Sequence, residues 1–164
     1  MYLHLMQEEI HERLHAPELG PCVCAQVRRL ARKFSSLYDT LLSPEDLTIT
    51  QYSLLANIER AGQLSHLVLA EKVGMERTTL TRNLRPLTRA KWVAAATGKD
   101  RRQHLLQLTA AGRRKLGRSL PLWEEAQRQF LSQIGFESLQ ELRALLASSE
   151  SAVTKAFTAD QEKP

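Results

Sequence analysis

Arginine and threonine side chains recur at helical spacing between residues 77 and 85, and both types suit contacts with nucleic acid. A guanidinium group can donate two hydrogen bonds to a guanine edge, and a threonine can contact a phosphate or a thymine methyl group. The side chains are Arg77, Thr78, Thr79, Thr81, Arg82 and Arg85. A solvated helix face usually mixes charges of both signs, and that mixture is missing here. The pattern therefore favours a surface that binds an anionic partner.

The charge of the whole chain is positive and unevenly distributed. Its 23 Lys and Arg residues exceed its 18 Asp and Glu residues, which gives a formal net charge of +5. Residues 77–118 hold twelve of the basic residues and a single acidic one, Asp100. Such a segment attracts nucleic acid or an anionic membrane surface, and the balance alone proves neither.

Two short helices around Gly74 are predicted to position the Arg and Thr side chains. The first runs from about Ser65 to Lys72, and Gly74 after it suits a left-handed helix cap. The inward side chains of this helix are expected to be Leu67, Ala70 and Val73. A short helix, a glycine turn and a second helix form a helix-turn-helix, whose second helix can enter the major groove of DNA.

The second helix is predicted from about Glu76 to Ala90. Leu80, Leu84 and Leu87 recur at three- and four-residue spacing and mark its apolar face. The Arg and Thr side chains therefore face outward. Pro86 lies inside the pattern and is expected to perturb the last turn of the helix.

The periodicity changes from helical to strand-like after this helix. Residues 92–97 and 103–109 have the pattern of two strands, joined by a polar tip at 98–102. A two-stranded ribbon directly after a helix-turn-helix is predicted to form a wing beside the second helix.

The tip of this ribbon carries three cations and one carboxylate. Lys99, Arg101 and Arg102 can reach a minor groove, where concentrated negative potential favours an inserted arginine. Asp100 can hold a neighbouring guanidinium group in two hydrogen bonds and so fix its direction. Taken alone, the tip also fits an ordinary polar hairpin turn. Beside the Arg and Thr helix, we interpret it as a wing that contacts DNA.

Helical periodicity accounts for nearly all of the remaining chain. Further helices are expected within residues 3–14 and from about 22 to 42, 48 to 61, 110 to 134 and 138 to 156. Thr48 and Gln51 match a capping box, and Thr109 can cap the helix that follows it. The tail after Phe157 is polar and is expected to fray. The predicted fold class is mainly α with a small β wing, a winged helix-turn-helix joined to a helical lobe.

The terminal helices carry more apolar surface than a small winged domain can cover. Residues 1–47 and 110–164 are therefore predicted to form a dimerisation lobe, and residues 48–109 a DNA-binding lobe. A two-fold dimer would bury the surplus surface and place two recognition helices about one DNA turn apart on a palindrome. Packing within one chain is the alternative.

Six short motifs follow one another along the chain. They are Leu47-Thr48-x-x-Gln51-Tyr52, Leu69-Ala70-Glu71-Lys72-Val73-Gly74-Met75, Thr79-Leu80-Thr81-Arg82, Lys91-Trp92-Val93, Asp100-Arg101-Arg102 and Leu108-Thr109-x-x-Gly112. In order and spacing, they resemble the MarR family of winged helix-turn-helix transcriptional regulators. The resemblance covers about residues 22–156, and the short N-terminal helix is an addition to it.

This resemblance implies a homodimeric regulator, expected to be a repressor, that binds a palindromic operator in double-stranded DNA. Helix 76–90 would lie in the major groove and wing 98–102 in the minor groove. The resemblance also implies that Asp100 braces Arg102, the wing arginine directed into the minor groove.

Cys22 and Cys24 stand at the start of the long helix. A thiol at a helix N-terminus has more thiolate character, which is the condition for redox reactivity. By the resemblance, Cys24 falls where the hydroperoxide-sensing branch of the family keeps its reactive cysteine, and Tyr38 where that branch keeps a supporting tyrosine. Arg28 and Ile49 replace two further tyrosines of that branch, which removes hydrogen bonds to the thiolate.

Two other roles for this Cys-x-Cys pair stay open. Two thiolates suit a soft metal ion such as Cu(I). Both side chains can also serve as small apolar fillers, and free cysteine is commonly buried for that reason alone. The structural role is the favoured one of the three.

A small aromatic effector is a further expectation from the resemblance. Many MarR-type proteins bind aromatic acids in a cleft between the two lobes, which here would lie near Phe34, Tyr38 and Tyr52. Core packing explains these three aromatic residues equally well.

Several other classes of protein are disfavoured. The chain has no glycine-rich phosphate loop, nucleophile elbow or paired carboxylates, so no enzyme and no cofactor are predicted. The histidines lack zinc-site spacing, and His66 and His104 are expected at the surface or near DNA. No apolar run is long enough to span a membrane and no leader pattern is present, so a cytoplasmic protein is expected. A winged helix that binds only protein would have a neutral or acidic second helix.

Overall fold

The computed structural model describes residues 4, 6–8, 10–11, 20–97 and 104–161. Its elements are α2 (Val23–Leu42), η1 (Ser43–Glu45), α3 (Ile49–Ala61), β1 (Leu64–Ser65), α4 (His66–Val73), α5 (Arg77–Arg89), β2 (Val93–Thr97), β3 (His104–Leu108), α6 (Ala110–Ile134) and α7 (Phe136–Gln161). The fold is mainly helical with one small antiparallel sheet, as predicted. None of the described helices combines the length and the apolar character needed to cross a membrane.

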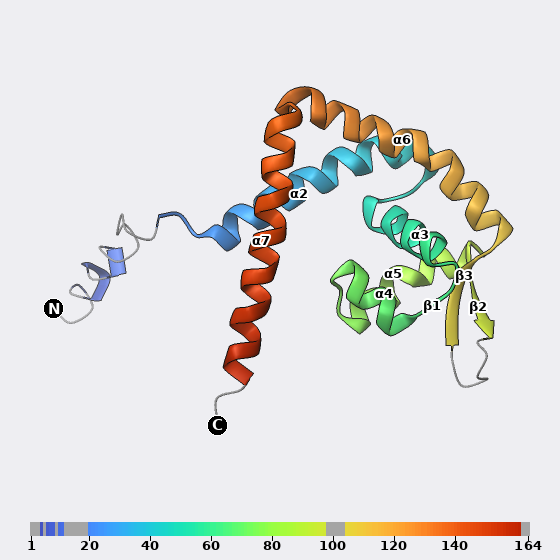
Figure 1. Ribbon diagram of the computed structural model, residues 1–164, viewed down its shortest axis with the longest axis horizontal. Coiled ribbons are helices and arrows are strands. Elements are labelled where there is room, and N and C mark those ends of the chain that lie inside the picture. The colour runs from blue at the N-terminus through green and yellow to red at the C-terminus, as the bar shows by residue number, and fades with distance from the viewer. Residues whose placement is uncertain (1–3, 5, 9, 12–19, 98–103, 162–164) are drawn as a thin grey trace.

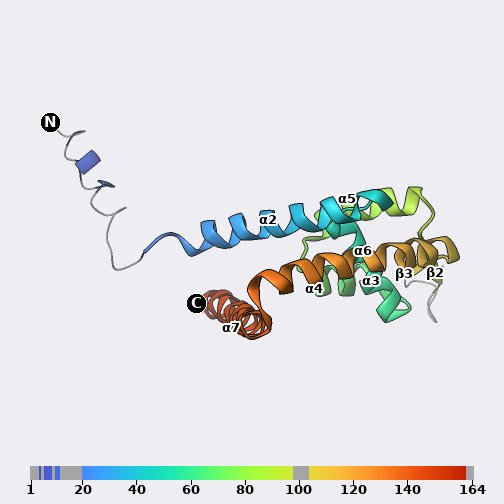
Figure 2. The ribbon, with the colours of Figure 1, turned by 90° about the horizontal axis from the view of Figure 1, so that it is seen from above.

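Two long helices connect the parts of the molecule. α2 and α6 contact each other; they cross in Figure 1 and lie next to each other in the view from above (Figure 2). Helices α3, α4 and α5 and the sheet gather at the end of this pair where α2 finishes and α6 starts (Figure 1). α7 starts at the far end of α6 and turns away from it at a steep angle (Figures 1 and 2).

Side-chain caps set the starts of three helices. The Thr48 hydroxyl accepts a hydrogen bond from the Gln51 backbone N–H at 3.3 Å, and the Gln51 side chain accepts one from the Thr48 N–H at 3.1 Å. This is the predicted capping box. Ser65 caps α4, and Thr109 caps α6 by accepting from the Gly112 N–H at 3.0 Å. The predicted range of α6, 110–134, agrees with the structure at both ends.

The sheet has three strands rather than the two that were predicted. Its order is β1-β3-β2, with every neighbouring pair antiparallel. β1 has two residues, and Leu64 pairs with Leu106 of β3. A two-residue strand is too short to show an alternating pattern, so β1 could not be predicted from hydrophobic periodicity.

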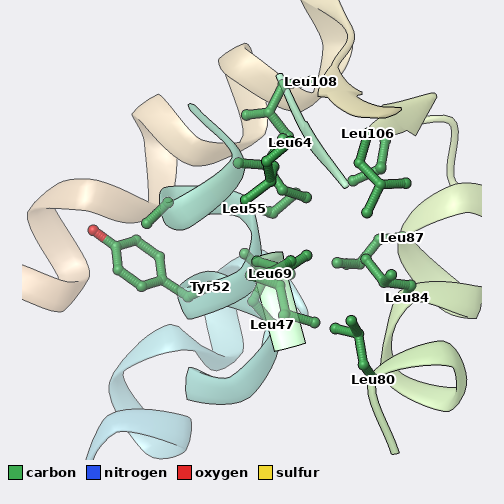
Figure 3. Packing of buried hydrophobic residues seen from close by; sticks show 14 of the residues in the cluster. Leu47, Tyr52, Leu55, Leu64, Leu69, Leu80, Leu84, Leu87, Leu106 and Leu108 are labelled. Atoms are coloured by element: carbon green, nitrogen blue, oxygen red, sulfur yellow. The ribbon is translucent and has the colours of Figure 1, made fainter. Parts of the chain in front are cut away.

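The core lies between α3, α4, α5 and the sheet. Leu80, Leu84 and Leu87 of α5 point toward Leu55 of α3 and Leu69 of α4 (Figure 3). Burial of these leucines fixes which side of α5 meets the core and which side faces outward.

The predicted inward face of α4 was wrong at Leu67, which is 66% exposed. Leu69 is fully buried instead, next to the buried Ala70. Leu67 stands two residues before Leu69 and so lies about 200° around the helix from it. Val73 is half-buried, at the edge of the core.

The last helix is longer than predicted. α7 runs from Phe136 to Gln161, so the backbone stays helical beyond Phe157 where fraying was expected. No proline or glycine interrupts this segment, and nothing in its backbone chemistry stops the helix.

Candidate nucleic-acid interface

The outward face of α5 carries the predicted Arg and Thr residues. Leu80 and Leu87 are fully buried and Leu84 is 4% exposed, so the opposite side of the helix faces solvent. Five of the six predicted side chains are exposed, namely Arg77, Thr78, Thr81, Arg82 and Arg85. Thr79 is half-buried and lies at the margin of this face.

Proline does not end α5 where it stands. Pro86 lacks the N–H that would bond the carbonyl of Arg82, but the helix continues to Arg89. The Ala90 N–H donates to the Pro86 carbonyl, which completes the last turn. The expected perturbation is therefore limited to one missing hydrogen bond inside the helix.

The arginines of α5 have no acidic partner among the described residues. Arg77, Arg82, Arg85 and Arg89 form no ion pair with any residue in the described ranges. Four positive charges on one exposed helix therefore remain available to an external anion.

The basic residues of α6 have a different environment. Arg113 pairs with Glu59 at 3.1 Å, and Lys115 and Arg118 both pair with Glu45 at 2.9 and 3.0 Å. The basic residues of 77–118 are continuous in sequence, but those on α5 and those on α6 have different surroundings in the structure. The α5 arginines form no ion pair with the described residues. Three of the four cations that this stretch has on α6 pair with carboxylates of α3 and η1.

A shallow groove borders the α5 face. It is lined by His66, Thr78, Thr81, Arg82, Leu84, Arg85, Thr88 and Arg89. His66 is the first residue of α4, so the start of that helix forms one side of the groove. Thr88 and Arg89 belong to this face but were not among the residues predicted from the sequence. Spacings of seven residues from Thr81 to Thr88 and four from Arg85 to Arg89 would have found both.

Left-handed backbone conformations and backbone hydrogen bonds fix the loops at both ends of α5. Gly74 before it has a φ of 62° and forms the predicted left-handed cap of α4. Lys91 after it has a φ of 59°, and the Trp92 N–H donates to the Leu87 carbonyl at 2.9 Å. The Thr109 N–H donates to the Trp92 carbonyl at 3.0 Å, so the end of α5 is tied to the start of α6.

The predicted wing is described up to its tip. β2 and β3 pair from Val93 with Leu108 to Thr97 with His104. The tip residues Lys99, Asp100, Arg101 and Arg102 lie outside the described residues, so the Asp100 brace stays a prediction.

The two cysteines are exposed free thiols at the start of α2. Cys22 is the N-cap residue and Cys24 lies in the first turn. Tyr38 is buried fourteen residues further along the same helix, about 21 Å away. A single chain therefore does not bring Cys24 and Tyr38 together. Burial raises the pKa of Tyr38, so its hydroxyl stays protonated at neutral pH.

The aromatic residues of the predicted effector cleft pack against α6. Phe34 meets Phe130 edge to face, with ring centroids 4.7 Å apart. Tyr52 stacks on Trp123 at 5.7 Å. These contacts are those of core aromatics, and an effector cleft at Phe34, Tyr38 and Tyr52 stays a prediction.

Comparison with known proteins identifies the family. No family model matches the chain. The transcriptional regulator MosR of M. tuberculosis, solved in complex with DNA, is 37% identical over 80% of this chain and 98% of its own, with a TM-score of 0.69. The chain belongs to the MarR family of transcriptional regulators.

More distant structures share the MarR-family fold. A mutant MarR of E. coli complexed with operator DNA is 23% identical over 80% of this chain and 95% of its own, with a TM-score of 0.73. A probable transcriptional regulator of Pseudomonas aeruginosa is 23% identical over 80% of this chain and 98% of its own, with a TM-score of 0.70. The MarR-type winged helix is therefore the fold of this chain.

Proposed function

We propose that this MarR-family protein is a homodimeric transcriptional regulator that binds a palindromic operator in double-stranded DNA. The observation that carries the proposal is the exposed cationic face of α5, whose arginines form no ion pair with the residues that the structure describes. MosR, which is 37% identical, was crystallised with DNA and supports the same assignment.

The length of α5 fits a recognition helix. Arg77 and Arg89 stand at its two ends, twelve residues or about 18 Å apart along the axis. The major groove of B-DNA is about 12 Å wide, so the two end arginines can reach phosphates on both sides of it. Arg82 and Arg85 lie between them and would meet base edges, where an arginine can donate two hydrogen bonds to guanine.

The wing would supply a second contact. The β2–β3 ribbon follows α5, and Lys99, Arg101 and Arg102 stand between its two strands in the sequence. We propose that Arg102 enters the minor groove and that Asp100 fixes its direction. Arg102→Ala should then weaken operator binding, and unchanged affinity would contradict the wing assignment.

Two terminal helices expose apolar side chains that suit a dimer. On α2 these are Val23, Val27 and Leu30, and on α7 they are Leu145, Leu146 and Val153. Large exposed apolar faces on a monomer usually mark an interface. Residues 1–47 and 110–164 would then form the dimerisation lobe and residues 48–109 the DNA-binding lobe.

The charges on the same helices are complementary. α2 exposes Arg28, Arg29, Arg32 and Lys33. The sequence of α7 has four acidic residues, Glu137, Glu141, Glu150 and Asp160, and two basic ones, Arg143 and Lys155, so its net charge is negative. The α2 cations make no ion pair within the described parts of the chain. Contact between α2 of one copy and α7 of a second would bring opposite charges together around the apolar residues.

An operator-bound dimer that blocks transcription is a repressor, and a signal would have to release it. Thiol oxidation is favoured over an aromatic effector, because Cys22 and Cys24 are both exposed to an oxidant. Two thiols and one hydroperoxide would give a disulfide, an alcohol and water. Binding of a soft metal ion and a purely structural role are the other outcomes for this pair.

The salt dependence of DNA affinity tests the proposed function. Cationic side chains that contact phosphates displace condensed counterions, so the logarithm of affinity falls linearly with that of the salt concentration. Fluorescence anisotropy with a labelled random duplex should show a fall of about a thousandfold between 50 and 200 mM salt for a protein with several phosphate contacts. An affinity that does not change with salt would contradict the proposal.

A further inference from the structure

A buried cation, Lys115, lies between the segment that follows α2 and the segment that follows α5. Lys115 of α6 is 6% exposed, although lysine is among the residues least often buried. Its Nζ lies 2.9 Å from a carboxylate oxygen of Glu45 and 4.8 Å from the centre of the Trp92 ring. One ammonium group therefore contacts two segments that are far apart in sequence.

The Trp92 side of this contact belongs to the end of α5. The Trp92 N–H donates to the Leu87 carbonyl, one turn back in the recognition helix. The Trp92 carbonyl accepts from Thr109, and a Cβ placed on Gly112 would collide with that carbonyl. The Trp92 backbone is thus bonded to α5 through its N–H and to the start of α6 through its carbonyl, so the position of Trp92 and that of the end of α5 depend on each other.

The Glu45 side of the contact belongs to the end of α2. Glu45 closes the short η1 turn directly after that helix. Hydrogen bonds from Arg118 and Lys115 hold the pKa of Glu45 below its ordinary value, so it is an anion at neutral pH. The α2–α6 pair thus presents a fixed negative charge that orients the Lys115 ammonium group.

The direction of α5 decides whether its side chains can meet base edges. The helix has 13 residues and is about 20 Å long. A tilt of about 5° at its Trp92 end would move the other end by about 1.7 Å. Donor–acceptor distances in N–H···O hydrogen bonds span only about 2.7 to 3.2 Å, so that displacement would break a base contact.

We infer that Lys115 is a positioning residue for DNA recognition, which fixes α5 against the α2–α6 pair by bridging Glu45 and Trp92. The inference rests on the proposed function, because it concerns how that function gains specificity. A buried ion pair adds little to stability compared with a well-packed apolar side chain. Methionine at position 115 could fill similar space against Trp92, but it could not hold the ring to Glu45.

The test separates specific from general DNA affinity. The probes are a duplex that the wild-type protein enriches from a randomised pool and a scrambled duplex of the same composition. At one salt concentration, Lys115→Met should lower the ratio of the two affinities about tenfold, the equivalent of one good base contact. Its affinity for the scrambled duplex should stay within about twofold, because the surface cations are unchanged.

Two further variants control for a merely structural effect. Lys115→Arg keeps the charge and should recover most of the ratio. Arg118→Gln removes the other cation that pairs with Glu45. Because the Arg118 side chain is 58% exposed, this variant should keep the ratio of the two affinities within about twofold of wild type. An equal fall in Arg118→Gln, or no fall in a folded Lys115→Met, would overturn the inference.

The remaining outcomes are also decisive. A wild-type protein that enriches no duplex from the pool contradicts the proposed function itself. A wild-type protein that enriches one, with Lys115→Met keeping the same ratio, contradicts only the role of Lys115. If circular dichroism shows that Lys115→Met does not fold, Glu45→Gln takes its place with the same expected fall, and an unchanged ratio there overturns the inference.

Discussion

The Thr109 hydroxyl donates a 2.7 Å hydrogen bond to the carbonyl of Lys91, eighteen residues earlier in the chain. The same oxygen accepts from the Gly112 N–H and caps α6. One side chain thus ties the segment just after α5 to the start of α6.

Replacement of Thr109 by valine should destabilise the protein. Both hydrogen bonds would be lost while the shape is nearly kept, and loss of a helix cap alone costs about 0.5–2 kcal/mol. We expect a fall of about 2 kcal/mol in the free energy of unfolding, measured by urea denaturation. Thr109→Ser retains the hydroxyl and should lie close to wild type. Equal stability of the valine and serine variants would show that the two hydrogen bonds contribute nothing.

Gly112 and Gly117 form a matched pair for a second prediction. A Cβ on Gly112 would collide with the Trp92 carbonyl, whereas a Cβ on Gly117 would meet nothing within 4 Å. Gly112→Ala should therefore cost about 1–3 kcal/mol, as forced overpacking does. Gly117→Ala should stabilise α6 by up to about 1 kcal/mol, because alanine is the better helix former. Thermal melts of the two variants should move in opposite directions, and a shift of the same sign would refute the close approach at Gly112.

Acid stability should depend on Glu45. Its folded pKa is lowered by hydrogen bonds from Arg118 and Lys115, from an ordinary value of 4.5. The stabilisation is therefore complete above the unfolded pKa and is lost as the pH falls through the lower folded value. Between about pH 5 and pH 3, the unfolding midpoint should fall more steeply for wild type than for Glu45→Gln.

An exposed glutamate of α4 provides the control for this pH dependence. Glu71 makes no ion pair within the described residues, so Glu71→Gln should keep the wild-type slope. Parallel slopes for wild type and Glu45→Gln would mean that the carboxylate gains nothing from its two partners.

The oligomeric state should depend on the apolar face of α7. Leu145 is 64% exposed, and Leu145→Glu would place a charge in the proposed interface. Sedimentation velocity should show a shift from dimer to monomer. Leu67, equally exposed at 66% but on α4, is the matched control, and Leu67→Glu should remain dimeric. A dimeric Leu145→Glu would place the interface elsewhere.

The helix caps and the buried face of α5 could be predicted from the sequence because they depend on residues close together in the chain. The caps at Thr48 and Thr109 involve residues three positions away, and the leucines of α5 recur at three- and four-residue spacing from Leu80 to Leu87. Such signals need no knowledge of the rest of the chain. Once the leucines of α5 were assigned to the core, the Arg and Thr residues on the opposite side had to face solvent.

Other features depend on contacts that no local pattern contains. Leu67, Val68, Leu69 and Ala70 form a continuous apolar run in an eight-residue helix, so more than one face fitted the core. Lys115 and Glu45 are seventy residues apart, and nothing near either residue indicates its partner. For the same reason, the sequence could not tell which arginines of the basic stretch are neutralised within the chain.

One pair of variants shows whether the exposed arginines of α5 contact DNA bases. Arg82 lies in the middle of the α5 face, and Arg114 of α6 is an exposed arginine outside that face with no ion pair among the described residues. Affinities of Arg82→Ala and Arg114→Ala for the duplex enriched by wild type should be measured side by side at one salt concentration. We predict a loss of about tenfold or more for Arg82→Ala and a change within about twofold for Arg114→Ala. Equal affinities of the two variants would contradict the assignment of α5 as the recognition helix.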